Sequence, residues 1–229
     1  MYTDKINKIM HYEKHLDMLK KGLQEDNIAT LFEQYESYEI LKSYYESDIW
    51  KEDYYLDEQN AFPPTLKRGV LAQDELYNTL ENVENILTSF MHTYAYTCGV
   101  IDAFCEVVKA GVKDLALSHP TSKEEIVKLL PYAKMLCKKY NISCEVEHHL
   151  LISDLFPYSA NKGKSVILFY KKQEIIDAYH QLKQAKQDAL LKNTYDTIRE
   201  DIAYCFGKLL SYSDDSIYTY IKTNKEKES

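Results

Sequence analysis

Apolar residues recur at intervals of three and four over much of this 229-residue chain, which constrains it to a helix-rich fold. In residues 3–24 this spacing places an apolar stripe along one face of a helix. Residues 28–47 continue the pattern after a break at Gly22 and the polar residues that follow it. We interpret the region as two antiparallel helices in a coiled-coil-like hairpin, although no proline forbids one long helix.

Residues 48–72 lose helical periodicity, and two consecutive prolines within them predict an ordered loop. A third helix is expected to begin near Gln73 or Asp74. We expect Gly99 to mark a bend or break in this helix. Gly69, just before it, predicts a tight turn that requires a positive φ angle.

From residue 112 onward, short strand patterns alternate with helical ones. Residues 115–118 form a short apolar run, 143–148 alternate as in a half-buried strand, and 166–170 are continuously apolar. A capping-box pattern, Ser122 with Glu125, begins the helix between the first two strands. Further helices are expected at about 173–192, 195–211 and 214–222, followed by a polar tail, Lys225–Ser229, that should fray.

This order of elements predicts an α/β, helix-rich fold. We expect a small, mostly parallel three-stranded sheet covered by helices, with 143–148 at an edge. The charge distribution indicates two units, because residues 1–97 hold 9 Lys and Arg against 18 Asp and Glu, whereas residues 98–229 hold 19 against 18. We therefore expect an acidic helical domain over 1–90 and a small α/β domain with C-terminal helices over 91–229.

Residues 44–80 contain several uncommon short sequence motifs in a fixed order. They include Tyr-Tyr-Glu-Ser-Asp-Ile-Trp at 44–50 and Leu-Lys-Arg-Gly-Val-Leu at 66–71. This stretch resembles the bacterial domain of unknown function 4298, and the resemblance covers about the first 90 residues. It implies a helical domain without a known activity. Ala72 stands where the family pattern usually has Ser, which leaves the cap of the next helix to Gln73 or Asp74.

Composition and charge exclude several classes of protein. No apolar run approaches the roughly 18–20 residues that span a bilayer, so we expect no membrane association. The N-terminus lacks the charged-then-apolar layout of a signal peptide, and we expect a cytoplasmic protein. The acidic first part and the nearly neutral second part argue against nucleic-acid binding.

The five cysteines are odd in number and lack Cys-x-x-Cys spacing, which argues against a disulfide framework. The cysteines expected in the core are Cys105, Cys137, Cys144 and Cys205. A zinc site could be imagined from Cys137, Cys144, His148 and His149, but their spacing matches no standard ligand pattern. We therefore predict neither a metal nor a cofactor.

Tyrosine is abundant, with 21 copies against 7 Phe and 1 Trp. Most of these residues fall on helix stripes, where they act as bulky core side chains. A second group lies among carboxylates and outside clear periodicity: Tyr44, Tyr45, Trp50, Tyr54 and Tyr55. This group either closes the core of the helical domain or forms a recognition surface for a protein partner or a second copy.

Polar residues follow each predicted strand. They are Ser118, His119, Thr121 and Ser122 after the first, His148 and His149 after the second, and Lys171 after the third. Because the carboxyl ends of parallel strands meet at one edge of a sheet, these residues could line one crevice. His119 or His148 would act there as an acid or base, and Lys171 would hold an anion. The alternative is a helix N-cap with surface histidines.

No glycine-rich fingerprint, nucleophile motif or metal cluster stands out in this sequence. We therefore favour a protein-binding or regulatory module without catalysis. The alternative is an enzyme or sensor that binds an anionic, phosphorylated small molecule at the strand ends.

Overall fold

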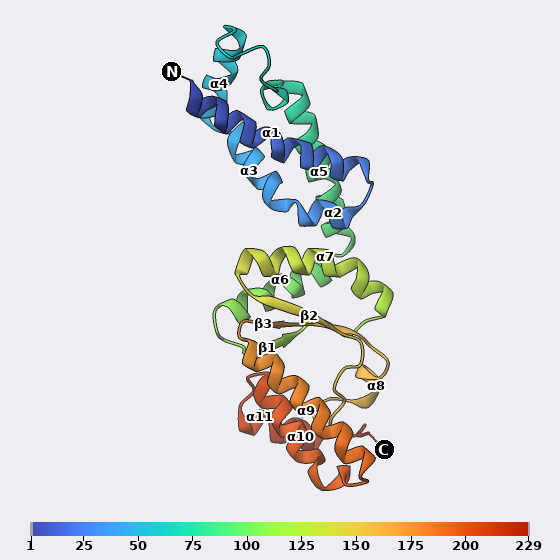
Figure 1. Cartoon of the computed structure of the whole chain (residues 1–229). Helices are drawn as coiled ribbons and strands as arrows, with labels where there is room; N and C mark the ends of the chain where they lie inside the picture. Colours follow the sequence, from blue (N-terminus) through green and yellow to red (C-terminus); the bar gives the residue numbers. More distant parts are fainter. Residues whose placement is uncertain (1, 229) are drawn as a thin grey trace. The chain divides into compact units, whose positions relative to one another are not determined.

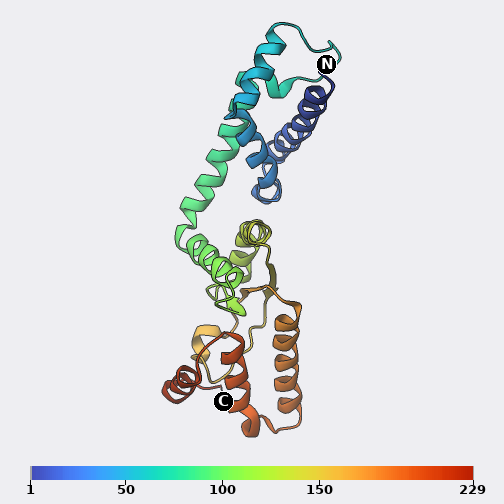
Figure 2. The same cartoon turned by 90° about the vertical axis from the view of Figure 1, so that its left-hand side faces the viewer.

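The computed structural model describes residues 2–228. The chain divides into two compact units, with the boundary between Tyr94 and Ala95. Figures 1 and 2 show the elements of each unit in two orthogonal views. The division into an acidic helical domain over 1–90 and a small α/β domain over 91–229 stays a prediction.

The first unit is built from helices. They are α1 (Thr3–Gln24), α2 (Ile28–Glu33), α3 (Tyr35–Tyr45), α4 (Asp48–Glu58), a 3-10 turn η1 (Gly69–Leu71) and α5 (Gln73–Thr93). Helix α1 packs against both α3 and α5 (Figure 1). The stripe predicted for α1 forms the centre of this core, since Ile9, Leu16 and Leu19 are fully buried. Two turns, at 25–27 and at Gln34, divide residues 3–47, so the single long helix is wrong.

Residues 48–58, for which the sequence shows no helical periodicity, form helix α4, whereas the predicted loop around the two prolines is confirmed between α4 and η1. Ser47 caps this helix by accepting a hydrogen bond from Trp50 N at 3.2 Å. The buried positions of α4 are Trp50 and Asp53. Because one of these is a carboxylate, a search for apolar periodicity could not detect the helix.

Both glycine predictions are wrong. The positive-φ glycines are Gly111 and Gly163, not Gly69. A Cβ atom at Gly69 would lie 3.2 Å from Leu16 Cδ2, so this glycine permits the close approach of η1 to α1. Gly99 lies inside a continuous helix, and the predicted third helix ends instead at Thr93.

The second unit combines helices with one sheet. Its elements are α6 (Ala95–Lys109), β1 (Leu115–Leu117), α7 (Lys123–Tyr140), β2 (Ser143–Glu147), α8 (Tyr158–Asn161), β3 (Val166–Tyr170), α9 (Gln173–Leu191), α10 (Tyr195–Leu209) and α11 (Asp214–Thr223). Helices α6 and α7 cover one face of the sheet, and α9 and α10 lie on the other side (Figure 1).

The sheet has three strands, as predicted, but its pairing is antiparallel. The strand order is β1-β3-β2, and both neighbours of β3 run opposite to it. The mostly parallel sheet is therefore wrong. The connection between β2 and β3 contains only the four-residue helix α8, and the chain reverses through it instead of crossing back along the sheet. Strand β3 is apolar throughout because it is central and covered on both faces.

One further prediction for this unit is wrong. Cys205 is exposed although it lies on the α10 stripe, whereas Cys105 and Cys137 are buried and Cys144 is half-buried. The described part of the C-terminal tail contacts the rest of the unit, and its fraying stays a prediction. Glu226 O accepts a hydrogen bond from Tyr158 N at 2.9 Å, and Glu228 pairs with Lys186.

In residues 2–228, none of the helices is both long and apolar enough to cross a membrane.

Candidate ligand-binding site

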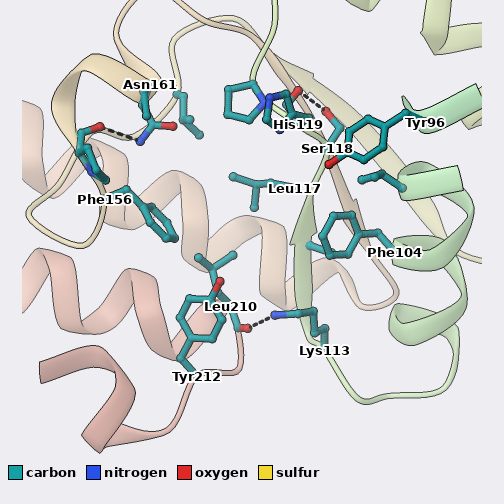
Figure 3. Close-up of a pocket in the computed structure, with 16 residues that line it drawn as sticks. Tyr96, Phe104, Lys113, Leu117, Ser118, His119, Phe156, Asn161, Leu210 and Tyr212 are labelled. Carbon is teal, nitrogen blue, oxygen red and sulfur yellow. Dashed lines mark hydrogen bonds between the residues drawn. The ribbon is translucent and has the colours of Figure 1, made fainter. Parts of the chain in front are cut away.

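A pocket of about 420 Å³ opens in the second unit, within the size range of sites for small ligands. Its walls come from α6, from β1 and the residues after it, from the segment around α8, and from the turn between α10 and α11 (Figure 3). The aromatic and aliphatic side chains in these walls include Tyr96, Val100, Phe104, Leu117, Leu150, Phe156, Leu210 and Tyr212. The lining is mainly apolar, which favours a ligand with an apolar body.

Lys113 provides the cationic group of this pocket. Its Nζ donates a hydrogen bond to Leu210 O at 2.7 Å and lies 4.6 Å from the centre of the Tyr212 ring. In the described part of the chain, no carboxylate pairs with this ammonium group. Burial lowers the pKa of Lys113, because the charged form loses hydration that no anion replaces.

His119 lies at the other end of the pocket (Figure 3). Its side chain is exposed, and it shares this end with Asn161, whose Nδ2 donates to Pro157 O at 3.4 Å. Polar groups therefore occupy both ends of a mainly apolar cavity. The histidine, which the sequence singled out, could hydrogen-bond a polar group at the rim.

Ser118 is buried and its hydroxyl is committed to the backbone. The Oγ atom accepts a hydrogen bond from Ile167 N at 2.8 Å and donates one to His119 O at 3.4 Å. This geometry joins the end of β1 to β3. Ser118 is therefore a structural residue of the pocket wall and is poorly placed to act as a nucleophile.

The antiparallel sheet brings together only part of the predicted crevice. Thr121 and Ser165 exchange two backbone hydrogen bonds, of 2.9 and 2.8 Å, and His148 Nδ1 lies 3.1 Å from Ser165 Oγ. The ends of β1 and β2 thus meet beside the start of β3. Lys171 follows the end of β3, so it lies at the opposite edge, where its Nζ donates to Lys109 O at 3.2 Å.

The remaining residues of the predicted crevice have local roles. Ser122 caps α7 by accepting a hydrogen bond from Glu125 N at 3.2 Å. His149 N donates to Glu147 Oε1 at 2.7 Å. Neither His148 nor His149 lines the pocket, and both side chains are exposed.

A buried polar network supports the segment that follows β2. Glu147 Oε2 accepts hydrogen bonds from the Tyr179 hydroxyl at 3.2 Å and from Lys183 Nζ at 2.5 Å. Leu151 N donates to the same tyrosine hydroxyl at 3.2 Å. Burial, followed by the charge of Glu147, raises the pKa of Tyr179. These contacts hold the chain that leads into the pocket wall.

In the first unit, the structure separates the tyrosine and tryptophan group by burial. Trp50 is 8% exposed and its Nε1 donates to Val70 O at 2.8 Å, while the Tyr44 hydroxyl donates to Asp53 Oδ2 at 3.0 Å. Both residues therefore close the core. Tyr45 and Tyr54 are half-buried against the Trp50 ring, and Tyr55 is 60% exposed. A recognition role for this group stays a prediction, and it can now involve only its exposed part.

The sequence did not predict most of the pocket walls. Tyr96 and Phe104 share helix α6, but Phe156 and Tyr212 come from segments that are distant in the chain, and no spacing rule connects these three segments. The one available signal was the position of His119 directly after a strand. In residues 2–228, no group of three or more His, Cys, Asp or Glu is arranged to hold a metal ion.

Residues 5–93 match the family model described as domain of unknown function (DUF4298), which confirms the resemblance of the first ninety residues. No curated protein and no solved structure matches the chain. The pocket lies outside the matched residues.

Proposed function

We propose that the second unit is a binding or sensing module for a small amphipathic acid. Such a ligand has an apolar body and one carboxylate or phosphate group. The observation that carries this proposal is Lys113, a cation in the wall of a mainly apolar pocket that has no anionic partner among residues 2–228. The proposal narrows the sequence-based alternative of an anionic ligand and replaces Lys171 by Lys113 as the cation.

The energetic reasoning concerns the ammonium group. A partly buried charge loses hydration, and one carbonyl and one aromatic ring replace that hydration incompletely. A ligand carboxylate or phosphate would add an ion pair in surroundings that are less polar than water, where the pair is stronger. The ligand's apolar body would cover Phe104, Leu117 and Phe156, which lie between the two polar ends (Figure 3).

Binding is favoured over catalysis because the polar groups near the pocket are already in use. Ser118 bonds the backbone through both its donor and its acceptor functions. His119 stands at the rim with no carboxylate to orient its ring among the contacts of the described residues. A nucleophile needs a neighbouring base, and the hydroxyl of Ser118 has none in this arrangement.

The experiment compares octanoate with its neutral analogue octanamide, using the full chain in a thermal-shift assay. An acid present at 100 times its Kd should stabilise the second unit by about 2.7 kcal/mol, which corresponds to a rise in Tm of about 10 °C. We expect octanoate to raise Tm more than octanamide does. Lys113→Met should remove this difference, because the methionine keeps the apolar stem and lacks the charge.

Lys171→Met is the matched control, since that lysine is exposed at the opposite edge of the sheet. It should leave the preference for the acid unchanged. Equal shifts with octanoate and octanamide in the wild-type chain would refute the ion-pair role of Lys113. The absence of a shift with octanoate, and with indole-3-acetate as an aromatic acid, would refute the ligand class.

A further inference from the structure

Two histidines on α1 face each other one helical turn apart. His11 and His15 have i, i+4 spacing, and their Nε2 atoms are 3.2 Å apart. Their rings lie nearly perpendicular, at 86°, with centroids 4.6 Å apart. His11 is exposed and His15 is half-buried, so the pair can be reached from solvent.

A serine from α3 contacts the inner histidine of this pair. Ser37 Oγ donates its one hydrogen to Met18 Sδ at 3.9 Å, and it lies 2.9 Å from His15 Nδ1. The contact between Ser37 Oγ and His15 Nδ1 fixes the orientation of the His15 ring and turns its Nε2 toward His11. When Nδ1 carries the ring hydrogen and Ser37 accepts it, Nε2 has a free lone pair for a ligand.

The separation of the two nitrogens suits a metal ion. With metal–nitrogen bonds of about 2.05 Å, two nitrogens 3.2 Å apart subtend about 103° at the metal, close to the tetrahedral angle. A zinc-binding histidine commonly donates its other ring N–H to a second group that fixes its orientation, and Ser37 Oγ lies 2.9 Å from His15 Nδ1, where it can accept such a hydrogen bond. Imidazole nitrogens select zinc, copper and nickel over magnesium and calcium.

We propose that His11 and His15 form a two-imidazole site for a divalent transition-metal ion, with Zn²⁺ as the representative, and that Ser37 is its positioning residue. To bind the ion, each histidine carries its ring hydrogen on Nδ1, so that both Nε2 lone pairs are free for the metal. In residues 2–228 no third side chain of the usual ligand types completes a cluster, so water fills the remaining positions.

The test is a calorimetric titration of the full chain, free of any histidine tag, with zinc chloride at pH 7. We expect saturable binding of one zinc ion per chain to this pair. His11→Ala and His15→Ala should each abolish it. His11 is exposed, so His11→Ala should keep the wild-type circular dichroism spectrum.

Ser37→Ala separates positioning from ligation, because both imidazoles remain. It should weaken zinc binding by about 10- to 100-fold, as loss of an outer partner does in other zinc sites. The double variant His148→Ala with His149→Ala is the matched control, since it removes another exposed histidine pair, and it should bind zinc as the wild type does. Zinc binding that survives in His11→Ala and His15→Ala, or that is absent from the wild type, would overturn the site. An unchanged affinity in Ser37→Ala would overturn the role of the serine.

Discussion

Replacing Arg199 by methionine should destabilise the second unit without affecting the first. Arg199 Nε and Nη2 donate to the two carboxylate oxygens of Asp154 at 2.9 and 2.8 Å. The Asp154 side chain is only 2% exposed, and Lys227 lies 3.4 Å from it. The pair joins α10 to the segment that forms part of the pocket wall.

The expected loss follows from the burial of the carboxylate. Removing one partner of a buried ion pair costs about 3–5 kcal/mol, because the other charge is left without compensation. Arg199 is 24% exposed and Lys227 remains near Asp154, so we expect a loss at or below the lower limit of this range, about 2–3 kcal/mol. With a urea m-value of about 2 kcal/mol per M, the midpoint should fall by about 1–1.5 M.

The single tryptophan makes the assay specific to each unit. Trp50 is buried in the first unit, so its fluorescence follows the unfolding of that unit alone. Far-UV circular dichroism follows both units. In Arg199→Met, we expect the dichroism transition of the second unit to move to lower urea and the tryptophan transition to stay in place.

Lys208→Met is the control for this experiment, because it removes an exposed ion pair with Asp214 whose two side chains are about half exposed. Its effect should stay below about 1 kcal/mol. If the tryptophan transition of Arg199→Met moved by the same amount as the dichroism transition, the two units would unfold as one. If neither moved, the Arg199–Asp154 pair would contribute nothing and our estimate would be wrong.

Three further predictions concern both units. Trp50→Phe should destabilise the first unit by about 1–3 kcal/mol, measured by dichroism in urea, because it leaves a buried backbone carbonyl without its donor. Ellman's reagent at pH 8 should find one fast thiol among the five, the exposed Cys205, whereas burial raises the pKa of Cys98 to about 11 and keeps it unreactive until unfolding. Hydrogen bonds from Lys208 and Tyr204 lower the pKa of Asp214, so these contacts stabilise the fold above the ordinary aspartate pKa, and the effect is lost as pH falls through the lowered value. NMR titration should show this pKa rising in Lys208→Met, and an unchanged value would contradict the assigned cause.

The histidine pair shows how far the sequence leads toward a candidate site. The spacing of His11 and His15 can be read from the chain, and it places both rings on one helix face. The direction of their nitrogens depends on Ser37, which follows His15 by 22 residues on another helix. Sequence spacing therefore indicates that the pair exists, while packing of α3 against α1 decides which nitrogen is presented.

The pocket, too, is indicated in part by the sequence and decided in part by packing. The sequence singled out His119 because it follows a strand, and the structure places it in the pocket wall. No pattern in the sequence pointed to Lys113, which lies outside any motif. The importance of this lysine comes from Leu210 and Tyr212, which approach from almost a hundred residues away. Local patterns do not contain such contacts.

The sequence by itself determined the positions of most helices, the three strands and the cap at Ser122, because these depend on residues within one or two turns of each other. Tertiary structure alone decided the direction of β3, since an apolar strand looks the same in either direction until its neighbours are placed. It also decided that α4 buries Trp50 beside a carboxylate, and that Cys205 faces solvent. Those outcomes depend on which surfaces meet, and the free energy of that contact is set by residues far apart in the chain.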